Sequence, residues 1–241
     1  MKERLYEINV NTRDEMMTGL KTIDYEGKFP HFWYLLEPLY SCEDTLRVGD
    51  VMGDGAKYVC NIHHIKQQEH CVYYGVGVDG EIHFDEALVK YLPHCEMHAF
   101  DPTPGSSVGL MPRKLQDLNI TFHKNYGLTA SDGPLSIGNL PDLEGRSLAT
   151  IRRQLGHTQR PIDILKIDIE GSEWEVLESI MEGCDRSTPV AHQLQIEFHS
   201  PKVRRFVNLV ASMLQCGYRP FAKDTNYYCM HCIEYAFVHE N

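Results

Sequence analysis

The chain has 241 residues, 42% of them hydrophobic, and a formal net charge of -11. These values are typical of a soluble globular protein with one sizeable domain and an appendage. The acidic balance disfavours a nucleic-acid partner, because phosphate binding normally needs a basic face. The sequence has no run of about 18 apolar residues, so we expect no membrane span in this chain.

The first 45 residues carry helical signals. Thr12 and Glu15 form a capping box, and apolar residues follow them at roughly helical spacing. Between residues 46 and 62, turn signals such as Gly53-Asp-Gly predict a short hairpin that ends on residues 57–60. We therefore expect an N-terminal helical extension and hairpin over residues 1–65, packed on a main domain over 66–241.

From residue 70 onward, strand patterns alternate with helix patterns. Strands are predicted at 71–74, 96–100, 120–123, 162–169, 193–198, 218–222 and 234–238, and helices at 83–92, 147–155, 173–181 and after Ser200-Pro201. Such alternation is typical of βαβ units in a parallel sheet. The last two strands follow each other directly, which indicates a hairpin with an antiparallel last strand. The pattern predicts an α/β fold with a mostly parallel sheet.

The most informative segment is the strand at 162–169 with the helix that follows it. The strand is nearly all apolar, as parallel strands covered on both faces are, and Lys166, Asp168 and Glu170 bring polar groups to its carboxyl end. Ligands bind at that edge of open α/β sheets. Ser172 and Glu175 predict a capping box at the helix start. The alternative is a structural corner with solvated acids.

Two further strand ends indicate a nucleoside site. The first strand leads into Gly75-x-Gly77 and Asp79, and the second ends in Asp101, an acid placed to grip ribose hydroxyls. The strict dinucleotide spacing fails, because residue 78 is Val and residue 80 is Gly. A nucleoside cofactor without pyrophosphate fits better, and S-adenosylmethionine is the obvious one.

These motifs resemble those of class I S-adenosylmethionine-dependent methyltransferases. Residues 163–173 match the FkbM-like pattern D-x-x-K-x-D-x-E-G-x-E. A closer resemblance is to an animal and nematode methyltransferase-like group, carried by the Cys42–Cys60 lead-in with Gly-Asp-Gly-x-Lys, the Tyr74–Gly77 loop, Phe84-Asp-Glu, residues 98–103 and the strand Gln193–His199. The resemblance covers roughly residues 42–240. It implies a Rossmann-like seven-stranded sheet with helices on both faces and an antiparallel last strand.

One departure from the family pattern concerns the acid just before the glycine loop. This chain has Tyr73-Tyr74 there, so another acid must hold the methionine amino group of the cofactor. The candidates are Asp79, Asp85, Glu86 and Asp168. The alternative for Asp85 and Glu86 is an exposed first helical turn, which favours acids in any case.

A second polar cluster lies on the strand after Asp168. Glu197 and His199 share one side of that strand and would lie beside Asp168 and Glu170 if the strands are neighbours. Such a cluster can bind a divalent metal or act as a base with its orienting group. We expect His199 or Asp168 as the base, with Lys166 and Glu197 as orienters. A metal on Asp168, Glu197 and His199 is possible but not favoured, and a hydrogen-bonded core pair is the structural alternative.

The resemblance also implies where the cofactor lies. Gly75 and Gly77 would allow its approach, Asp101 would hold the ribose, and either residues 127–129 or Asp132 would meet the adenine. The expected activity is methylation of an oxygen on a sugar or small molecule, by family analogy. The alternatives are a degenerate fold that binds a ligand or protein without methyl transfer, and a protein methyltransferase.

Eight cysteines leave the cellular compartment open. Cys42 and Cys60 flank a turn-rich segment and are expected to lie close together, bonded as a disulfide if the protein matures in an oxidising compartment. Cys229 and Cys232 form a lone C-x-x-C without the second pair that a structural zinc site needs, so buried or paired thiols are expected. The chain start lacks a signal-peptide core, which indicates a cytoplasmic protein, or a secretory one if a leader or anchor was removed. The sequon at Asn119 matters only in the second case.

Overall fold

The computed structural model describes residues 36–50, 55–78, 82–103, 111–138, 140, 143–200, 202–226 and 228–240. The strands are β1 Thr45–Val48, β2 Lys57–Cys60, β3 Val72–Val76, β4 Glu96–Phe100, β5 Thr121–His123, β6 Tyr126–Leu128, β7 Gly133–Leu135, β8 Leu143–Arg146, β9 Ile162–Ile167, β10 Ala191–His199, β11 Tyr218–Thr225 and β12 Cys232–His239. The helices are α2 Ile62–Gln67, α3 His83–Tyr91, α4 Met111–Asp117, α5 Leu148–Gln154, α6 Glu173–Glu182 and α7 Val203–Gln215. The helix predicted within residues 1–45 falls almost wholly outside the described residues.

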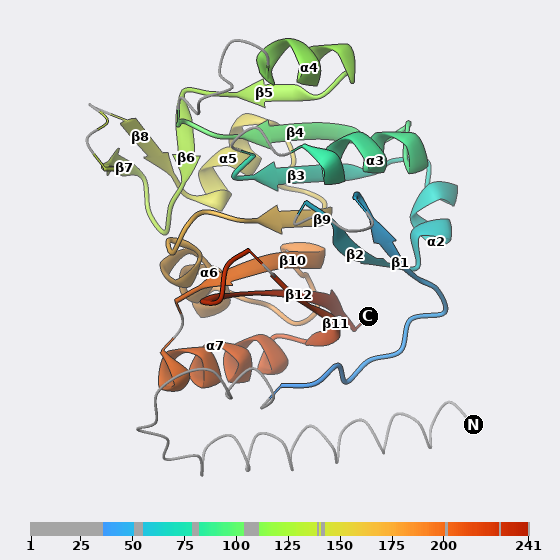
Figure 1. The fold of residues 1–241 in the computed structure, drawn as a ribbon, viewed down its shortest axis with the longest axis vertical. Helices are drawn as coiled ribbons and strands as arrows, with labels where there is room; N and C mark the ends of the chain where they lie inside the picture. The colour runs from blue at the N-terminus through green and yellow to red at the C-terminus, as the bar shows by residue number, and fades with distance from the viewer. Residues whose placement is uncertain are drawn as a thin grey trace.

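A seven-stranded sheet organises the molecule (Figure 1), with strand order β11-β12-β10-β9-β3-β4-β5. β5, β4, β3, β9 and β10 run parallel, and β12 is antiparallel to both of its neighbours. This confirms the predicted Rossmann-like α/β fold and its antiparallel last strand. The chain order reverses between β3 and β9, and the carboxyl ends of the strands at such a reversal are where sheets of this kind bind ligands.

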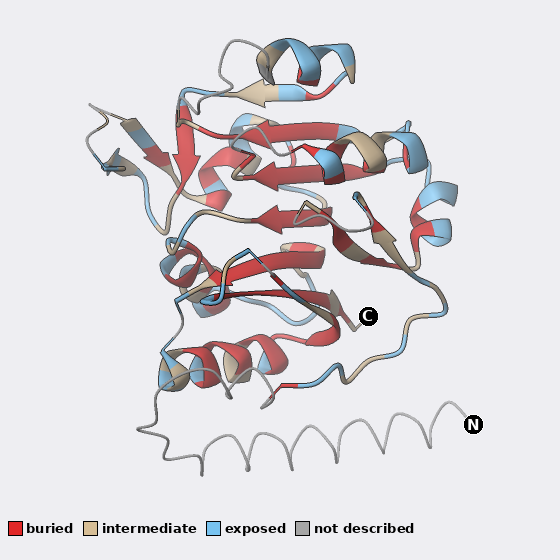
Figure 2. Ribbon diagram, viewed as in Figure 1, coloured by how far each residue is buried: buried red, intermediate tan, exposed pale blue. Residues whose placement is uncertain are grey.

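Apolar side chains cover both faces of the sheet, and the central strands are buried along most of their length (Figure 2). Tyr74 and Leu165 point to the face packed by α5, α6 and α7. Tyr73 and Ile164 point to the other face, where α3 packs. Alternate residues of one strand therefore enter separate cores, which explains why the strands read as continuous apolar runs.

The predicted hairpin is confirmed: β1 pairs antiparallel with β2. It packs on the face of the sheet that carries Gln193. The Gln193 side chain accepts a hydrogen bond from the Cys60 backbone N–H and donates one to the Cys60 carbonyl, at 2.9 and 2.7 Å. Gln195 donates to the Tyr58 carbonyl at 3.2 Å. Buried glutamines on β10 thus fix the hairpin, while the division into 1–65 and 66–241 stays a prediction.

All eight cysteines are paired in the structure. The disulfides join Cys42–Cys60, Cys71–Cys95, Cys184–Cys216 and Cys229–Cys232, with Cα–Cα separations of 5.5, 4.4, 5.9 and 5.3 Å. The first pair confirms the predicted bridge, and the last confirms that the C-x-x-C motif holds paired thiols.

Two helix starts differ from the prediction. Ser172 lies at the start of α6, but its backbone is already helical and its side chain makes no capping bond. The predicted capping box with Glu175 is therefore wrong. The side chain of the neighbouring Glu173 instead accepts a hydrogen bond from the Gly171 backbone N–H in the turn before the helix. Helix α7 begins at Val203 after an N-cap at Lys202, because Ser200 has a φ of 42° and turns the chain before the helix.

Three elements were not predicted: the short helices α2 and α4, and the three-stranded sheet with order β6-β8-β7. Each is short, so hydrophobic periodicity carries little signal for it. Among the described residues, none of the helices has the length and apolarity required to cross a membrane.

Candidate active site

The glycine loop after β3 is held in place by its neighbours. The backbone N–H of Gly77 donates to the Phe100 carbonyl, and that of Asp168 donates to the Val76 carbonyl, both at 3.0 Å. Lys166 Nζ donates to the Gly77 carbonyl at 2.6 Å. Gly77 has a φ of +76°, and a Cβ atom there would overlap the carbonyl oxygen of Asp168. Glycine is therefore required at position 77 by both conformation and space.

Gly75 leaves room for a buried hydrogen bond. A Cβ atom at position 75 would meet the Tyr73 hydroxyl and the Asp85 carboxylate, and that hydroxyl donates to Asp85 Oδ1 at 2.9 Å. Asp85 is fully buried, which corrects the alternative of an exposed helical turn, whereas Glu86 is only partly buried. Burial raises the pKa of Asp85, and its Oδ2 atom has no hydrogen-bond partner among the described residues.

Asp101 joins the ends of β3 and β4. Its Oδ2 atom accepts from the Val78 backbone N–H at 3.0 Å, and its Oδ1 atom accepts from the backbone and hydroxyl of Thr103. The side chain lies against the glycine loop, where a ribose grip requires an acid, and is almost wholly buried. The contact with a ribose stays a prediction.

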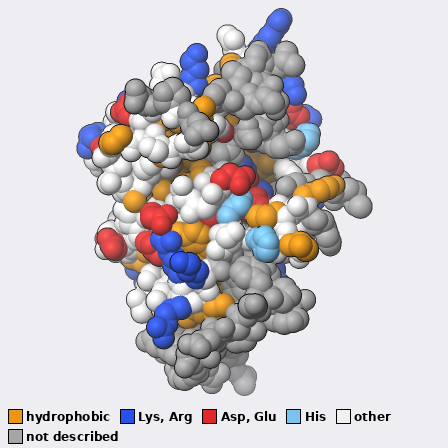
Figure 3. Space-filling model, turned by 60° about the vertical axis from the view of Figure 1, so that its left-hand side comes forward, with side chains coloured by type: hydrophobic (Ala, Val, Ile, Leu, Met, Phe, Trp, Pro, Cys, Tyr) orange, Lys and Arg blue, Asp and Glu red, His pale blue; other side chains and the backbone are white. Residues whose placement is uncertain are grey.

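Carboxylates surround His199 at the end of β10. His199 Nε2 lies 3.6 Å from Glu170 Oε2 and 3.9 Å from both Asp168 Oδ1 and Glu197 Oε1. Its Nδ1 atom lies 3.4 Å from Glu173 Oε1, which is an ion-pair distance rather than a hydrogen bond. Figure 3 brings the carboxyl edge of the sheet forward and shows acidic and histidine side chains close together on it.

The first turn of α6 holds the His199 backbone. Glu173 Oε1 accepts from the His199 N–H at 2.7 Å, and Trp174 Nε1 donates to the His199 carbonyl at 3.0 Å. The other Glu173 oxygen accepts from the Gly171 N–H at 2.8 Å. Glu170 has a φ of +54°, which turns the chain between Asp168 and α6. The end of β10 is therefore fixed against the end of β9.

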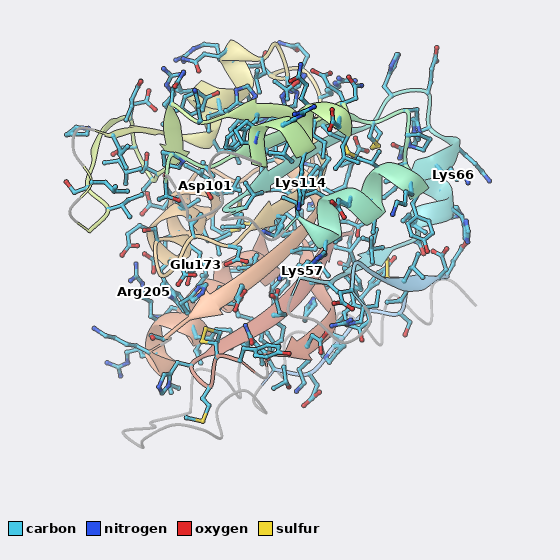
Figure 4. The ribbon with its side chains drawn as sticks, turned by 45° about the horizontal axis from the view of Figure 1, so that its top comes forward. Lys57, Lys66, Asp101, Lys114, Glu173 and Arg205 are labelled. Carbon is cyan, nitrogen blue, oxygen red and sulfur yellow. A yellow bond between two sulfur atoms is a disulfide. The ribbon has the colours of Figure 1, made fainter. Side chains whose placement is uncertain are left out.

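A buried charge network extends from Glu197 toward the hairpin. Lys57 of β2 forms an ion pair with Glu234 of β12 and lies 3.9 Å from Glu197 Oε2. Asn226 donates to Glu197 Oε1 at 2.8 Å. Glu197 and Glu234 are direct partners in the β10–β12 register, so the sheet places two buried carboxylates side by side. Figure 4 labels Lys57 together with Asp101 and Glu173.

The surroundings shift the pKa values of four groups at this edge: His199, Glu197, Asp168 and Lys57. Burial lowers the pKa of His199, but the Glu173, Glu197 and Asp168 carboxylates outweigh it and raise that pKa to about 9. Burial, with Glu234 and Asp168, raises the pKa of Glu197 to about 8. Burial also acts to raise the pKa of Asp168, yet the neighbouring cations Lys166, Lys57 and His199 lower it overall. Lys57 itself stays protonated, since its carboxylate partners overcome its desolvation.

Among the described residues, two sets of candidate metal-binding atoms share His199 at this edge, and one of them, Glu197 with His199 and Cys232, includes a cysteine held in a disulfide. Asp168, Glu170 and His199 each offer one ligand atom within 4.8 Å of the others. This set differs from the less favoured alternative of Asp168, Glu197 and His199, because Glu170 takes the place of Glu197. Two carboxylate oxygens and one imidazole suit a hard or borderline divalent ion.

The other residues predicted to contact the cofactor are Asp132, residues 127–129 and Asp79. Asp132 is exposed, and its two oxygens accept from the Ser147 N–H at 2.7 Å and the Thr150 hydroxyl at 2.6 Å, so it caps the start of α5. Residues 127–129 lie on and just after β6, close to the end of β4. Contact of either with adenine stays a prediction, and Asp79 lies outside the described residues.

A cavity lined by described residues lies elsewhere in the molecule. It measures about 280 Å³ and lies between α5, α6 and the start of β11, where Arg152, Ser179 and Tyr218 contribute to its wall. None of the charged groups around His199 lines it. We place the candidate active site at the carboxyl edge, because the glycine loop and the titratable groups converge there and not at this cavity.

The chain matches a family model described as "Methyltransferase domain" over residues 3–239. The chain belongs to this family of methyltransferase domains. The match, together with the sheet order, confirms the resemblance to class I S-adenosylmethionine-dependent methyltransferases; the FkbM-like subgroup stays a prediction.

Two curated relatives share part of the sequence. The "Probable methyltransferase-like protein 24" of Homo sapiens is 28% identical over 122 residues, which cover 50% of this chain and 31% of the relative. The protein of the same name from Rattus norvegicus is 30% identical over 49% of this chain and 30% of its own length. The matched segment thus spans about a third of the curated relatives.

Solved structures with a similar fold are more distant. An rRNA methylase from Streptococcus thermophilus is 12% identical, with a TM-score of 0.44 over 75% of this chain and 92% of that one. A ribosomal protein L11 methylase from Lactobacillus delbrueckii subsp. bulgaricus is 11% identical, with a TM-score of 0.41 over 75% of each chain. The family assignment rests on the match over residues 3–239.

Proposed function

We propose that this protein transfers the methyl group of S-adenosylmethionine to a hydroxyl oxygen of a sugar or small molecule. The observation that carries the proposal is the convergence of His199, Asp168 and Glu197 at the carboxyl edge beside the glycine loop. A base within reach of a bound acceptor is what a hydroxyl needs to lose its proton as the methyl group arrives.

The residues at the edge fit a cationic nucleoside cofactor. The orphaned Asp85 oxygen is a buried hydrogen-bond acceptor beneath the loop, in place of the acid that the family pattern has before it. We assign the cofactor amino group to this carboxylate and the ribose to Asp101. When bound, the cofactor supplies a methyl group on a sulfonium. Asp168, whose pKa is lowered, and the exposed Glu170 give the edge negative charge, which favours a cation there.

His199 is the proposed base, although it carries a proton in the free protein at neutral pH. The carboxylates around it raise its pKa, and a cation bound beside Asp168 offsets their charge and lowers that pKa again. Glu173 fixes the ring position, and Asp168 stabilises the imidazolium that forms when His199 takes the acceptor proton. Lys166 keeps the glycine loop against Asp168.

A metal-assisted version uses Asp168, Glu170 and His199 as ligands. In that case the ion would orient the acceptor oxygen and favour its deprotonation. The two versions differ in a direct test. A chelator abolishes turnover and a divalent ion restores it only in the metal version, and Glu170→Gln then weakens binding of Mn²⁺ measured by titration calorimetry in the absence of cofactor.

Cofactor binding is tested by calorimetric titration with S-adenosylhomocysteine. Loss of a charged hydrogen bond costs roughly 1.5–3 kcal/mol, so Asp101→Ala should weaken binding by more than about tenfold. Glu182→Ala, at an exposed acid at the end of α6, is the control and should leave the affinity unchanged. Equal affinities for the Asp101 variant and the wild type would contradict the ribose assignment.

Methyl transfer is tested against a panel of sugars, small hydroxylated molecules and proteins. His199→Ala should lower the rate by roughly a hundredfold or more while S-adenosylhomocysteine binding survives. The control is His192→Ala, a half-buried histidine at the other end of β10. Methylation of proteins alone would replace the proposed acceptor class. Cofactor binding without turnover on any acceptor would favour a binding module.

A further inference from the structure

We propose that Asn119 carries an N-linked glycan, attached in the oxidising compartment in which the four disulfides form. In the reaction, the side-chain amide nitrogen bonds to the anomeric carbon of a lipid-pyrophosphate-linked oligosaccharide. The bond between that carbon and the pyrophosphate oxygen breaks, the amide gives up one proton, and the lipid pyrophosphate leaves. The proposal is independent of methyl transfer.

The acceptor motif lies on an exposed turn. Asn119, Ile120 and Thr121 form the one Asn-x-Ser/Thr motif in the sequence. Asn119 and Thr121 are exposed, whereas Ile120 is buried and anchors the turn. The turn joins α4 to β5, and the backbone N–H of Asn119 donates to the Gln116 carbonyl at 2.9 Å. The Asn119 side chain is therefore exposed on a turn, where a glycosylating enzyme can reach it.

The cysteines provide an independent indication of the compartment. Each of the eight cysteines has a partner, and the four bridges lie in different parts of the described structure. Proteins of the reducing cytosol rarely keep structural disulfides, whereas secreted and lumenal proteins commonly do. A chain that forms all four bridges therefore passes through the compartment in which sequons are glycosylated.

The position of Asn119 is compatible with a bulky group. β5 is the last strand of the sheet, and Asn119 precedes it, so it lies at the amino edge. The candidate active site lies at the opposite, carboxyl edge, because β5, β4, β3 and β9 are parallel. A glycan there leaves the active site open and shields an exposed edge strand from pairing with other chains.

The test is expression of the chain behind a heterologous signal peptide in cultured animal cells. We expect the protein in the medium to shift in mobility after treatment with PNGase F, and protein in the lysate to shift with Endo H. Asn119→Gln and Thr121→Ala should each lose the shift, whereas Thr121→Ser should keep it. Asn125→Gln changes an exposed asparagine outside any sequon and should also keep it.

Peptide mapping gives a second readout that does not depend on secretion yield. After PNGase F, the peptide should carry an Asn119→Asp conversion, and unreduced protein should contain no alkylatable thiol. Protein with four disulfides but an unmodified Asn119, in both lysate and medium, would overturn the proposal. Free thiols on the unreduced, folded protein would contradict the inference that the chain matures in an oxidising compartment.

Discussion

His199 and Glu173 contact each other at two points: Glu173 Oε1 accepts from the His199 backbone N–H at 2.7 Å and lies 3.4 Å from the imidazole Nδ1. One fully buried carboxylate thus fixes both the position of the strand end and the charge of its side chain. Because Glu173 is the first residue of α6, the corner between β9 and α6 controls the acid–base state of a residue on β10.

Removing the Glu173 charge should lower the pKa of His199. Glu173→Gln takes away one of the carboxylates that hold the imidazole proton, so the pKa should fall from about 9 toward 6.5. NMR titration of the histidine ring measures this. Glu175→Gln, an exposed acid on the same helix paired with Arg205, is the control and should leave the His199 titration in place. An unchanged pKa in Glu173→Gln would contradict the proposed coupling.

The His199 pKa also predicts how stability depends on pH. Its folded-state pKa lies above the unfolded value, so its contribution is fully present below about pH 6.5 and is lost as pH rises through about 9. The difference in unfolding free energy between wild type and His199→Gln should therefore shrink over that range in urea titrations. A difference that grows with pH would show that the histidine is held neutral.

Lys57 should contribute to stability as the cation of a buried network. Lys57→Met leaves Glu234 and Glu197 buried without their counter-charge, and loss of one partner of a buried pair costs about 3–5 kcal/mol. The double variant Lys57→Met/Glu234→Gln should recover part of this loss. Lys66→Met, at an exposed lysine on α2 (Figure 4), is the matched control. Equal unfolding free energies for Lys57→Met and Lys66→Met would contradict the network.

Substituting Gly77 and Gly183 by alanine should have very different effects. Gly77→Ala forces a side chain into positive φ and against the Asp168 carbonyl, so cofactor binding and stability should both fall. Gly183→Ala, at the end of α6, meets nothing within 4 Å and should be nearly neutral. Circular dichroism melting and titration with S-adenosylhomocysteine check both variants. A neutral Gly77→Ala would mean that the loop is not held against β9.

Reduction should destabilise the protein. The Cys184–Cys216 bridge closes a 32-residue separation between the ends of α6 and α7, and a loop of that size is worth about 3–4 kcal/mol. The urea midpoint should fall when dithiothreitol is added, and Cys184→Ser/Cys216→Ser should reproduce part of that fall without reductant. A midpoint that does not respond to reductant would exclude structural bridges.

Much of the fold could be predicted, because strand–helix alternation is a local signal. The β9 strand, its terminal Asp168 and the Glu197-x-His199 pair were all visible as polar groups at strand ends. The convergence of these groups followed from one assumption, that β9 and β10 are neighbours, which the register confirms.

The rest of the site depends on pairings distant in sequence. Glu234 meets Glu197 only through the antiparallel β10–β12 register, and Lys57 reaches both only because the hairpin packs on β10. The one sequence signal for Lys57 was its place as the last residue of the Gly-Asp-Gly-x-Lys motif. Glu173 stood in the sequence only as the last acid of the D-x-x-K-x-D-x-E-G-x-E pattern, and the predicted capping box gave the helix-start roles to Ser172 and Glu175 instead.

The central claim is that the carboxyl edge around Asp168 and His199 is the site of methyl transfer. A crystal structure of the protein with S-adenosylhomocysteine tests it most directly. We predict the ribose at Asp101, the nucleoside across the Gly77 loop, and the sulfur atom facing Asp168 and His199. A ligand bound in the 280 Å³ cavity between α5 and α6, away from these residues, would contradict the account.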